Sequence, residues 1–156
     1  MFSIACIDGR LLEPSEAKVS VYDRGFLYGD SVFETMATRG GKIVDLSRHL
    51  SRLASSANDV GIPLPVTAEA LAAEIRKTVA ASGEGERAIR VMLTRGVGEW
   101  GLMPEEEGRA TRVLLVQELH RPSEEAYRTG IAAVTWQVQR PGDGTALLLA
   151  AGEFRG

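Results

Sequence analysis

The chain has 156 residues, about the length of one domain and enough to bury a substantial core. Its composition, 44% hydrophobic and 25% charged, is typical of a globular protein rather than a disordered or fibrous one. The net charge of −3 and the scattered basic residues argue against a nucleic acid or an anionic membrane as the main partner.

Cysteine usage and hydropathy indicate a cytoplasmic protein. Cys6 is the only cysteine, so no intrachain disulfide can form and a reducing compartment is favoured. No apolar run approaches the roughly 18 residues that a membrane span needs. The start, "MFSIACIDGR", lacks the basic segment of a signal peptide and turns polar early. No metal site is predicted.

The first third of the chain reads as strands joined by tight turns. "FSIACI" and "LLE" flank Asp8-Gly9-Arg10, and Asp-Gly favours a type I′ hairpin turn. "SVFETMAT" alternates two sets of side chains, as a strand does, and "RGG" turns it back into "KIVDL", residues 42–46.

Two helices follow. From Ser47 the apolar residues recur at helical spacing until "GIPLP" ends the helix, and a second helix is predicted after Thr67 as N-cap, ending at Gly83. The residues expected to face inward are Leu50, Leu53, Ala54, Ala57 and Val60 from the first helix, and Ala68, Leu71, Ile75 and Val79 from the second.

The remainder predicts strands in "RAIRVMLTRG" and "TRVLLVQEL", a short helix in "PSEEAYRTG" and a final strand in "IAAVTWQVQ", residues 131–139. Strands and helices are segregated rather than alternating. This order predicts an α+β fold with a largely antiparallel sheet packed with two helices.

The stretch "VYDRGFLYGDSVFETM" combines polar and conformationally special residues with large apolar ones. "YDRG" and "YGDS" predict two consecutive chain reversals before a strand, because Asp and Gly favour turns. One interpretation is a capped turn that feeds a core strand. The other is a substrate wall that presents Tyr28 and Phe33 to a cavity.

Four motifs in order, "VYDRGFLYGDSVFET", "RHLSRLASSANDVGIPLP", "AIRVMLTRGVGEWG" and the hairpin between the first two, resemble the N-terminal half of the class IV aminotransferases. The resemblance runs from about Cys6 to Pro141 and implies the fold type IV of pyridoxal-phosphate enzymes. This family includes branched-chain aminotransferases, D-amino acid transaminases and aminodeoxychorismate lyases. The motif "DRG…YGD…FET" is more similar to the last two.

The resemblance implies roles for particular residues. Arg52, in "HLSR", matches the arginine that binds the cofactor phosphate, and a guanidinium fork suits that group. His49 is expected to be structural. Arg90 and Arg95 match positions that bind a substrate carboxylate in different branches. Because they are five residues apart, they should point to opposite faces of a strand unless the strand ends or bends at Gly96.

The resemblance also marks two departures. The family usually carries Arg where this chain has Trp100, and the lysine that forms a Schiff base with the cofactor has no counterpart here. The lysines are Lys18, Lys42 and Lys77. We therefore expect a class IV N-terminal domain over residues 1–141 and a divergent or truncated tail over 142–156, without a catalytic residue of its own.

Three functions remain open at this point. The first is a pyridoxal-phosphate-dependent transaminase or lyase acting on an amino acid or an aminodeoxychorismate-like substrate, with a homodimeric full-length parent. The second is a non-catalytic, free-standing domain that acts through binding or a partner chain. The third is an α+β ligand-binding module unrelated to this cofactor.

Overall fold

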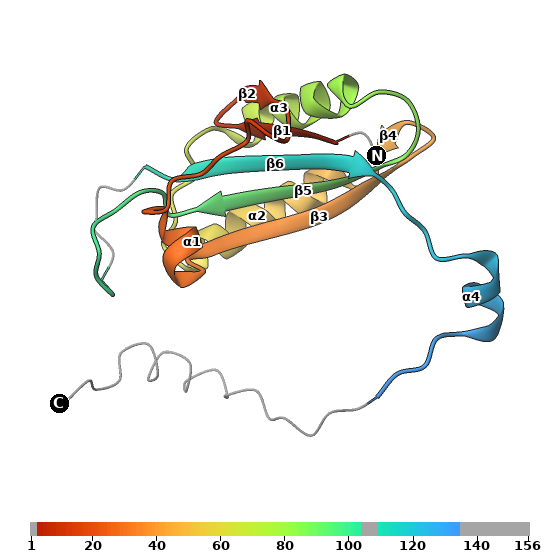
Figure 1. Ribbon diagram of the computed structural model, residues 1–156. Helices are drawn as coiled ribbons and strands as arrows, with labels where there is room; N and C mark the ends of the chain where they lie inside the picture. The colour runs from red at the N-terminus through yellow and green to blue at the C-terminus, as the bar shows by residue number, and fades with distance from the viewer. Residues whose placement is uncertain (1–2, 104–108, 135–156) are drawn as a thin grey trace. The chain divides into compact units, whose positions relative to one another are not determined.

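The described residues, 3–103 and 109–134 of the computed structural model, form a six-stranded sheet and four helices (Figure 1). The strands are β1 (Ser3–Ile7), β2 (Arg10–Leu12), β3 (Ser31–Arg39), β4 (Lys42–Ile43), β5 (Arg87–Thr94) and β6 (Thr111–Glu118). The helices are α1 (Arg24–Tyr28), α2 (Leu46–Asp59), α3 (Ala68–Ala81) and α4 (Glu124–Thr129).

All neighbouring strands of the sheet are antiparallel, in the order β2-β1-β6-β5-β3-β4. The Asp8-Gly9 turn between β1 and β2 has positive φ at both residues, 50° and 85°, which confirms the type I′ hairpin. The predicted α+β class with an antiparallel sheet is confirmed.

Strand β3 is paired very unevenly on its two sides. Residues 31–37 pair with β5, whereas β4 pairs only with Thr38 and Arg39. Most of β3 therefore forms an open edge of the sheet, and Figure 1 shows α2 running behind this strand.

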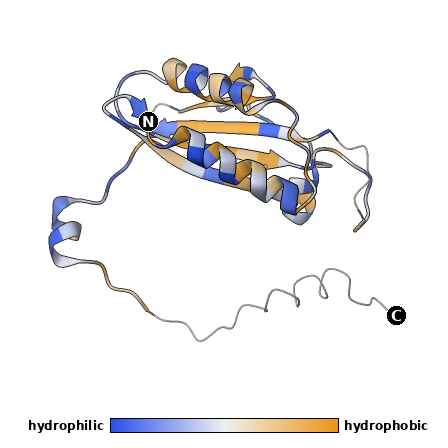
Figure 2. Ribbon diagram, turned by 180° about the vertical axis from the view of Figure 1, so that it is seen from behind, coloured by the Kyte–Doolittle hydropathy of each residue, from blue (hydrophilic) through white to orange (hydrophobic). Residues whose placement is uncertain are grey.

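Helices α2 and α3 cover one face of the sheet (Figures 1 and 2). In Figure 2 the strands are largely hydrophobic, and the helices carry hydrophilic residues on the side turned away from the sheet. The core between the two layers contains the fully buried residues Leu53, Leu71, Ile75, Ile89, Val91, Leu93 and Leu114. Because side chains alternate along a strand, the other face of the sheet receives Phe33, Thr35, Arg90 and Leu115, all of which are exposed.

Both long helices lie close to the predicted positions, with corrections at their ends. Thr67 is the N-cap of α3, since its hydroxyl accepts a hydrogen bond from the Ala70 N–H at 3.2 Å. Val60 and Ala68 were expected inside but are exposed, because α2 ends at Asp59 and Ala68 lies in the first turn of α3.

The strand expected over residues 42–46 is shorter than predicted. It stops at Ile43, because Asp45 adopts a left-handed conformation with φ 48° and starts α2 one residue before Leu46. Leu46 is then buried as the first core residue of the helix.

The end of the chain forms a second unit, described here by itself. The predicted short helix is confirmed as α4, capped by the Ser123 hydroxyl. Residues 131–134 of the expected final strand are not in a strand, and residues 135–139 and the tail 142–156 lie outside the described residues. Within the described ranges, no helix has the length and apolar character that crossing a membrane requires.

Candidate functional site

The stretch before β3 contains a one-turn helix where two turns were predicted. The buried Asp23 carboxylate accepts hydrogen bonds from the Gly25 N–H at 2.8 Å and from the Thr94 hydroxyl at 2.9 Å. A Cβ at Gly25 would lie 2.5 Å from the Thr94 Cγ2, so only glycine fits this approach. Asp23 therefore fixes α1 against the end of β5.

Asp30 accepts hydrogen bonds from two largely buried arginines. Arg95 binds it through both carboxylate oxygens, at 2.6 and 3.1 Å, and Arg24 donates to it at 3.2 Å. The Arg24 guanidinium also lies 4.7 Å from the centre of the Tyr28 ring. We call Asp30, Arg24 and Arg95 the Asp30 cluster.

Arg95 connects this cluster to the end of α2. Besides binding Asp30, it donates to the carbonyls of Val60 and Gly61 at 2.7 Å each. Four of its five N–H groups are thus engaged, and one Nη1 hydrogen remains for any other partner. Strand β5 ends at Thr94, and Arg95 turns toward α2, on the side of the sheet opposite Arg90.

Burial and the two arginines act in opposite directions on the Asp30 carboxyl. Burial alone would raise its pKa, but the hydrogen bonds and charges of Arg95 and Arg24 together lower the pKa below the ordinary value of 3.8. The carboxylate is therefore charged through the neutral range.

Arg52 lies on α2 beside the open edge of β3, and Glu34 binds it from that strand. The Arg52 Nε donates to Glu34 Oε1 at 2.9 Å, and Nη2 donates to Oε2 at 2.5 Å. The His49 Nδ1 lies 2.7 Å from the same Oε2. The Arg52 hydrogen bond lowers the pKa of Glu34, against a smaller effect of burial, and His49 lowers it further.

Arg52 keeps donors for a ligand. Its side chain is 57% exposed, and among the described residues its Nη1 makes no hydrogen bond. A phosphate takes hydrogen bonds from such a guanidinium. The residues present here thus fit a phosphate-bearing group.

Arg90 lies on the outer face of the sheet with two neighbours from β3. Its guanidinium is 4.7 Å from the centre of the exposed Phe33 ring, and its Nε donates to the Thr35 hydroxyl at 3.4 Å. No carboxylate pairs with it in the part of the chain that the structure describes. A cavity of about 280 Å³ adjoins it, lined by Thr35, Ala88, Ile89, Arg90, Leu115 and Gln117.

Strand β3 therefore lies between two cationic groups, one on each face of the sheet. Glu34 points toward α2 and Arg52, and the next residue, Thr35, points to the other face and Arg90. Each face of β3 thus has one arginine in contact with it. This is the arrangement that the predicted site residues form in space.

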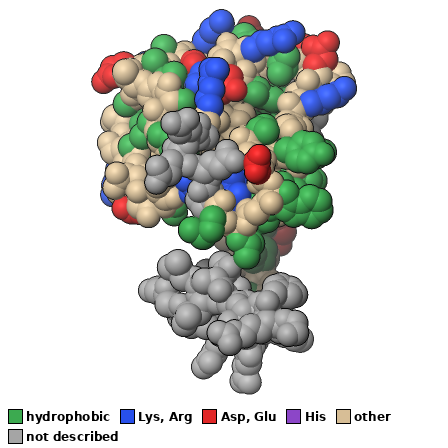
Figure 3. Space-filling model, turned by 90° about the vertical axis from the view of Figure 1, so that its left-hand side faces the viewer, with side chains coloured by type: hydrophobic (Ala, Val, Ile, Leu, Met, Phe, Trp, Pro, Cys, Tyr) green, Lys and Arg blue, Asp and Glu red, His purple; other side chains and the backbone are tan. Residues whose placement is uncertain are grey.

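Tyr28 belongs to an apolar surface around α1. Figure 3 views this end of the sheet and shows hydrophobic side chains gathered on it. We call this surface the α1 collar; its exposed members are Val19, Val21, Tyr22, Phe26, Leu27, Tyr28 and Val97.

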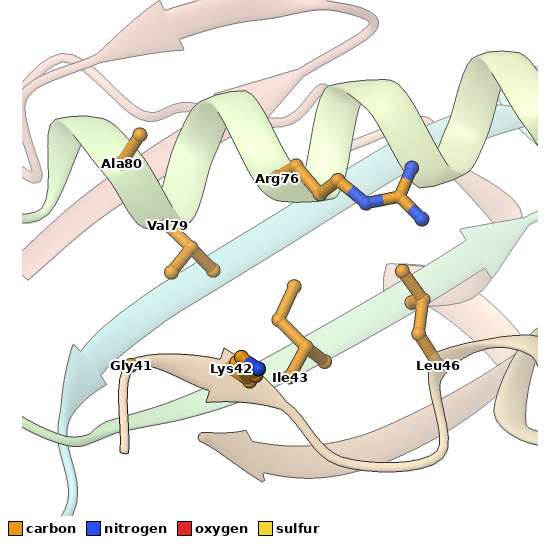
Figure 4. Close-up of a pocket in the computed structure, with 7 residues that line it drawn as sticks. All are labelled: Gly41, Lys42, Ile43, Leu46, Arg76, Val79 and Ala80. Atoms are coloured by element: carbon orange, nitrogen blue, oxygen red, sulfur yellow. The ribbon is translucent and has the colours of Figure 1, made fainter. Parts of the chain in front are cut away.

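A larger cavity, of about 390 Å³, lies between β4 and α3 (Figure 4). In it Val79 points toward Ile43, and Arg76 reaches toward Leu46. None of the five predicted site residues lines this cavity, so it is separate from the site at β3.

Sequence reasoning missed Glu34 and assigned no contact to Asp30. Glu34 was read only as one residue of an alternating strand, and Asp30 as a turn residue. Their arginine partners Arg52 and Arg95 lie 18 and 65 residues away, so no local pattern pointed to these contacts.

The chain is similar to known proteins in sequence and in fold. The family model for "Amino-transferase class IV" matches residues 31–146, most of the chain. The chain therefore belongs to the class IV aminotransferase family, which confirms the predicted resemblance.

Several curated relatives match more than half of the chain, and two of them illustrate the similarity. These two are a putative branched-chain-amino-acid aminotransferase from Methanocaldococcus jannaschii, 37% identical over 67% of this chain, and a D-alanine aminotransferase from Staphylococcus aureus, 38% identical over 60%. The matched parts cover 36% and 33% of these relatives, so the chain spans about a third of their length.

Many solved structures are similar in fold, among them the following two. The 4-amino-4-deoxychorismate lyase from Pseudomonas aeruginosa is 35% identical with a TM-score of 0.69, covering 81% of this chain and 44% of that one. The branched-chain aminotransferase from the archaeon Thermoproteus uzoniensis, solved with norvaline, is 27% identical with a TM-score of 0.69, covering 76% and 41%.

The Asp30 cluster generates a stability prediction. Asp30→Asn removes the carboxylate that Arg95 binds through both oxygens, and we expect the free energy of unfolding at pH 7 to fall by about 1–3 kcal/mol. The pKa of Asp30 is lower in the folded than in the unfolded chain, so the unfolded chain binds more protons near that pKa. The stability of the native chain must then decrease as the pH falls from about 5 through the folded pKa.

Urea unfolding followed by circular dichroism at pH 7 and pH 3 measures both effects. The variant should lose less stability between the two pH values than the native chain does. Exposed Asp59, on α2, is the matched position, and Asp59→Asn should leave the pH dependence unchanged. If the free energy of unfolding falls equally between pH 7 and pH 3 in the native chain and in Asp30→Asn, the prediction is wrong.

Proposed function

We propose that this chain provides the phosphate-binding and carboxylate-binding side of a pyridoxal-phosphate-dependent class IV enzyme, which transfers an amino group or releases pyruvate from an amino acid-like substrate. The single observation that carries the proposal is the placement of Arg52 and Arg90 against opposite faces of β3, through Glu34 and Thr35. Family membership supports the reaction class.

The phosphate end of the cofactor is assigned to Arg52. Its free Nη1 and its exposure suit an anion that arrives from solvent, and the His49 ring supports its partner Glu34. Bound pyridoxal phosphate supplies an electron sink for negative charge that develops on a substrate carbon. The role of Arg52 is binding and orientation only.

The substrate carboxylate is assigned first to Arg90. It has no carboxylate partner in the described ranges, and Phe33 beside it offers an apolar surface to the substrate side chain. Tyr28 is proposed to form the wall at the α1 end. Arg95 remains a proposed contact through its last free N–H, while its other donors fix the Asp30 loop.

The amine that reacts with the cofactor is proposed to come from outside this chain. None of Lys18, Lys42 and Lys77 matches the position at which the family carries it. Residues 1–141 are proposed as the class IV N-terminal domain and residues 142–156 as a divergent tail. The α1 collar supports a dimeric parent, because so large an exposed apolar surface is typical of an interaction site.

Phosphate binding tests the proposal most simply. Pyridoxine 5′-phosphate has no aldehyde and so avoids reaction with the chain's lysines, Lys18, Lys42 and Lys77. We expect Arg52→Ala to weaken its binding about tenfold, since the charge-assisted hydrogen bonds are lost. Isothermal titration calorimetry measures the affinity, with pyridoxine as the ligand that lacks the phosphate.

Arg48→Ala is the matched control, because Arg48 lies one turn earlier on α2, is exposed and makes no ion pair with the described residues. It should bind as tightly as the native chain. Equal loss in both variants, or no preference for the phosphate ester over pyridoxine, would contradict the proposal.

Carboxylate binding gives a second prediction. We expect 4-methylpentanoate to bind and to shift the NMR signals of residues around Arg90, whereas the neutral 4-methylpentanamide does not. Arg90→Ala should weaken the carboxylate's binding about tenfold. Arg39→Ala removes an exposed arginine from the end of β3 and should have no effect. If 4-methylpentanoate binds Arg90→Ala as tightly as the native chain, Arg90 is not the residue that binds the substrate carboxylate.

A non-catalytic domain is the second candidate, and the lysine positions favour it for this chain taken alone. Addition of pyridoxal 5′-phosphate followed by borohydride reduction should then give no single-site adduct by mass spectrometry. A stoichiometric adduct on one lysine would show that the chain supplies its own amine.

A further inference from the structure

Glu34 connects strand β3 to two residues of α2, His49 and Arg52, and holds them in place through its carboxylate. Its side chain is only 12% exposed, whereas that of its partner Arg52 is 57% exposed. The two Arg52–Glu34 hydrogen bonds, 2.9 and 2.5 Å, form a parallel pair between the guanidinium edge and the carboxylate. The buried carboxylate is thus the fixed partner and the arginine the one that is held.

His49 strengthens this contact. Its Nδ1 lies 2.7 Å from Glu34 Oε2 and 3.2 Å from the Arg52 Nη2. His49 and Arg52 are one helical turn apart, so a single carboxylate fixes the same face of α2 at two points. The Nε and one Nη2 hydrogen of Arg52 are occupied, and Nη1, which has no hydrogen bond to any described residue, is available to a ligand.

Two effects of Glu34 on a bound phosphate oppose each other. Glu34 restricts the arginine before the ligand arrives, which removes part of the entropy loss on binding. Its negative charge, however, repels the phosphate. The ligand side of Arg52 faces water, where charge repulsion is weak and is screened by salt. Orientation is not screened, so at physiological ionic strength it is the larger effect.

We infer that Glu34 is a positioning residue for the phosphate site, holding the Arg52 guanidinium at the open edge of β3 with Nη1 directed to the ligand. The inference rests on the proposed function, because it presumes that Arg52 binds a phosphate. Glu34 itself is not expected to touch the ligand; it acts through Arg52.

A double-mutant cycle tests this inference. The affinity for pyridoxine 5′-phosphate is measured by calorimetry at about 0.15 M ionic strength in the native chain, Glu34→Ala, Arg52→Ala and the double variant. We expect Glu34→Ala to weaken binding about fivefold in the native background and to have no effect once Arg52 is absent. Glu74→Gln is the matched control, because Glu74 forms the same paired contact with Arg112 elsewhere in the fold.

Glu34→Gln is a second variant, used in case Glu34→Ala does not fold, because it keeps the size of the side chain. Circular dichroism shows whether each variant is folded. Glu34→Gln retains one acceptor oxygen and loses the charge, so we expect binding about threefold weaker than native. Unchanged or tighter binding would show that the charge of Glu34 competes with the phosphate, and would overturn the inference.

The outcomes separate the two proposals. If the native chain binds the phosphate ester no better than pyridoxine, the proposed function fails and this inference falls with it. If Arg52→Ala loses binding while Glu34→Ala and Glu34→Gln bind like the native chain, only the positioning role is wrong. An equal loss from Glu34→Ala with and without Arg52 would also overturn that role.

Discussion

The one-sided pairing of β3 is the constraint on which the candidate site depends. A strand with neighbours on both sides has its backbone N–H and C=O groups hydrogen-bonded along both edges, but in the described part of the chain residues 31–37 pair with β5 alone. Side chains still alternate between the two faces along an edge strand, so the side chains of the adjacent residues Glu34 and Thr35 point to opposite faces of the sheet. Arg52 from α2 and Arg90 from β5 thereby contact opposite faces of β3 without lying on the same element.

Two carboxylates, Glu34 and Asp30, connect the β3 region to α2 at different points along the helix. Glu34 contacts the middle of the helix through His49 and Arg52, and Asp30 contacts its C-terminal end through Arg95. Each carboxylate is partly buried and has its pKa lowered, so both stay charged at neutral pH. Their partners differ in exposure: Arg95 is largely enclosed, whereas Arg52 faces water. The contact through Arg95 therefore suits a structural role, and the one through Arg52 suits a ligand.

The sequence predicted the parts of the fold that repeat a period. Helices α2 and α3 and strands β3, β5 and β6 show clear periodicities and form where expected, and Thr67 caps α3 through its hydroxyl. The one-turn helix α1 was missed because five residues are too few to show a helical period. Apolar, β-branched sequence predicted a strand over residues 131–139, but its described part, residues 131–134, is not in a strand; a strand also needs a neighbour to pair with.

The candidate site was predictable only in part, and the reason is distance along the chain. Motif resemblance singled out Arg52, Arg90 and Arg95, but their partners lie 18, 55 and 65 residues away and follow from strand register and helix placement. Local patterns carry no such information. For this reason Arg90 and Arg95 looked equivalent in sequence, while in the structure one has no carboxylate partner in the described ranges and the other holds Asp30.

The central claim is that a phosphate-bearing ligand binds at the open edge of β3, and amide chemical-shift mapping tests it most directly. Pyridoxine 5′-phosphate is titrated into ¹⁵N-labelled chain. We expect the largest shifts at Glu34, His49 and Arg52. Shifts concentrated instead on Lys42 and Arg76, which line the separate cavity between β4 and α3, would contradict it.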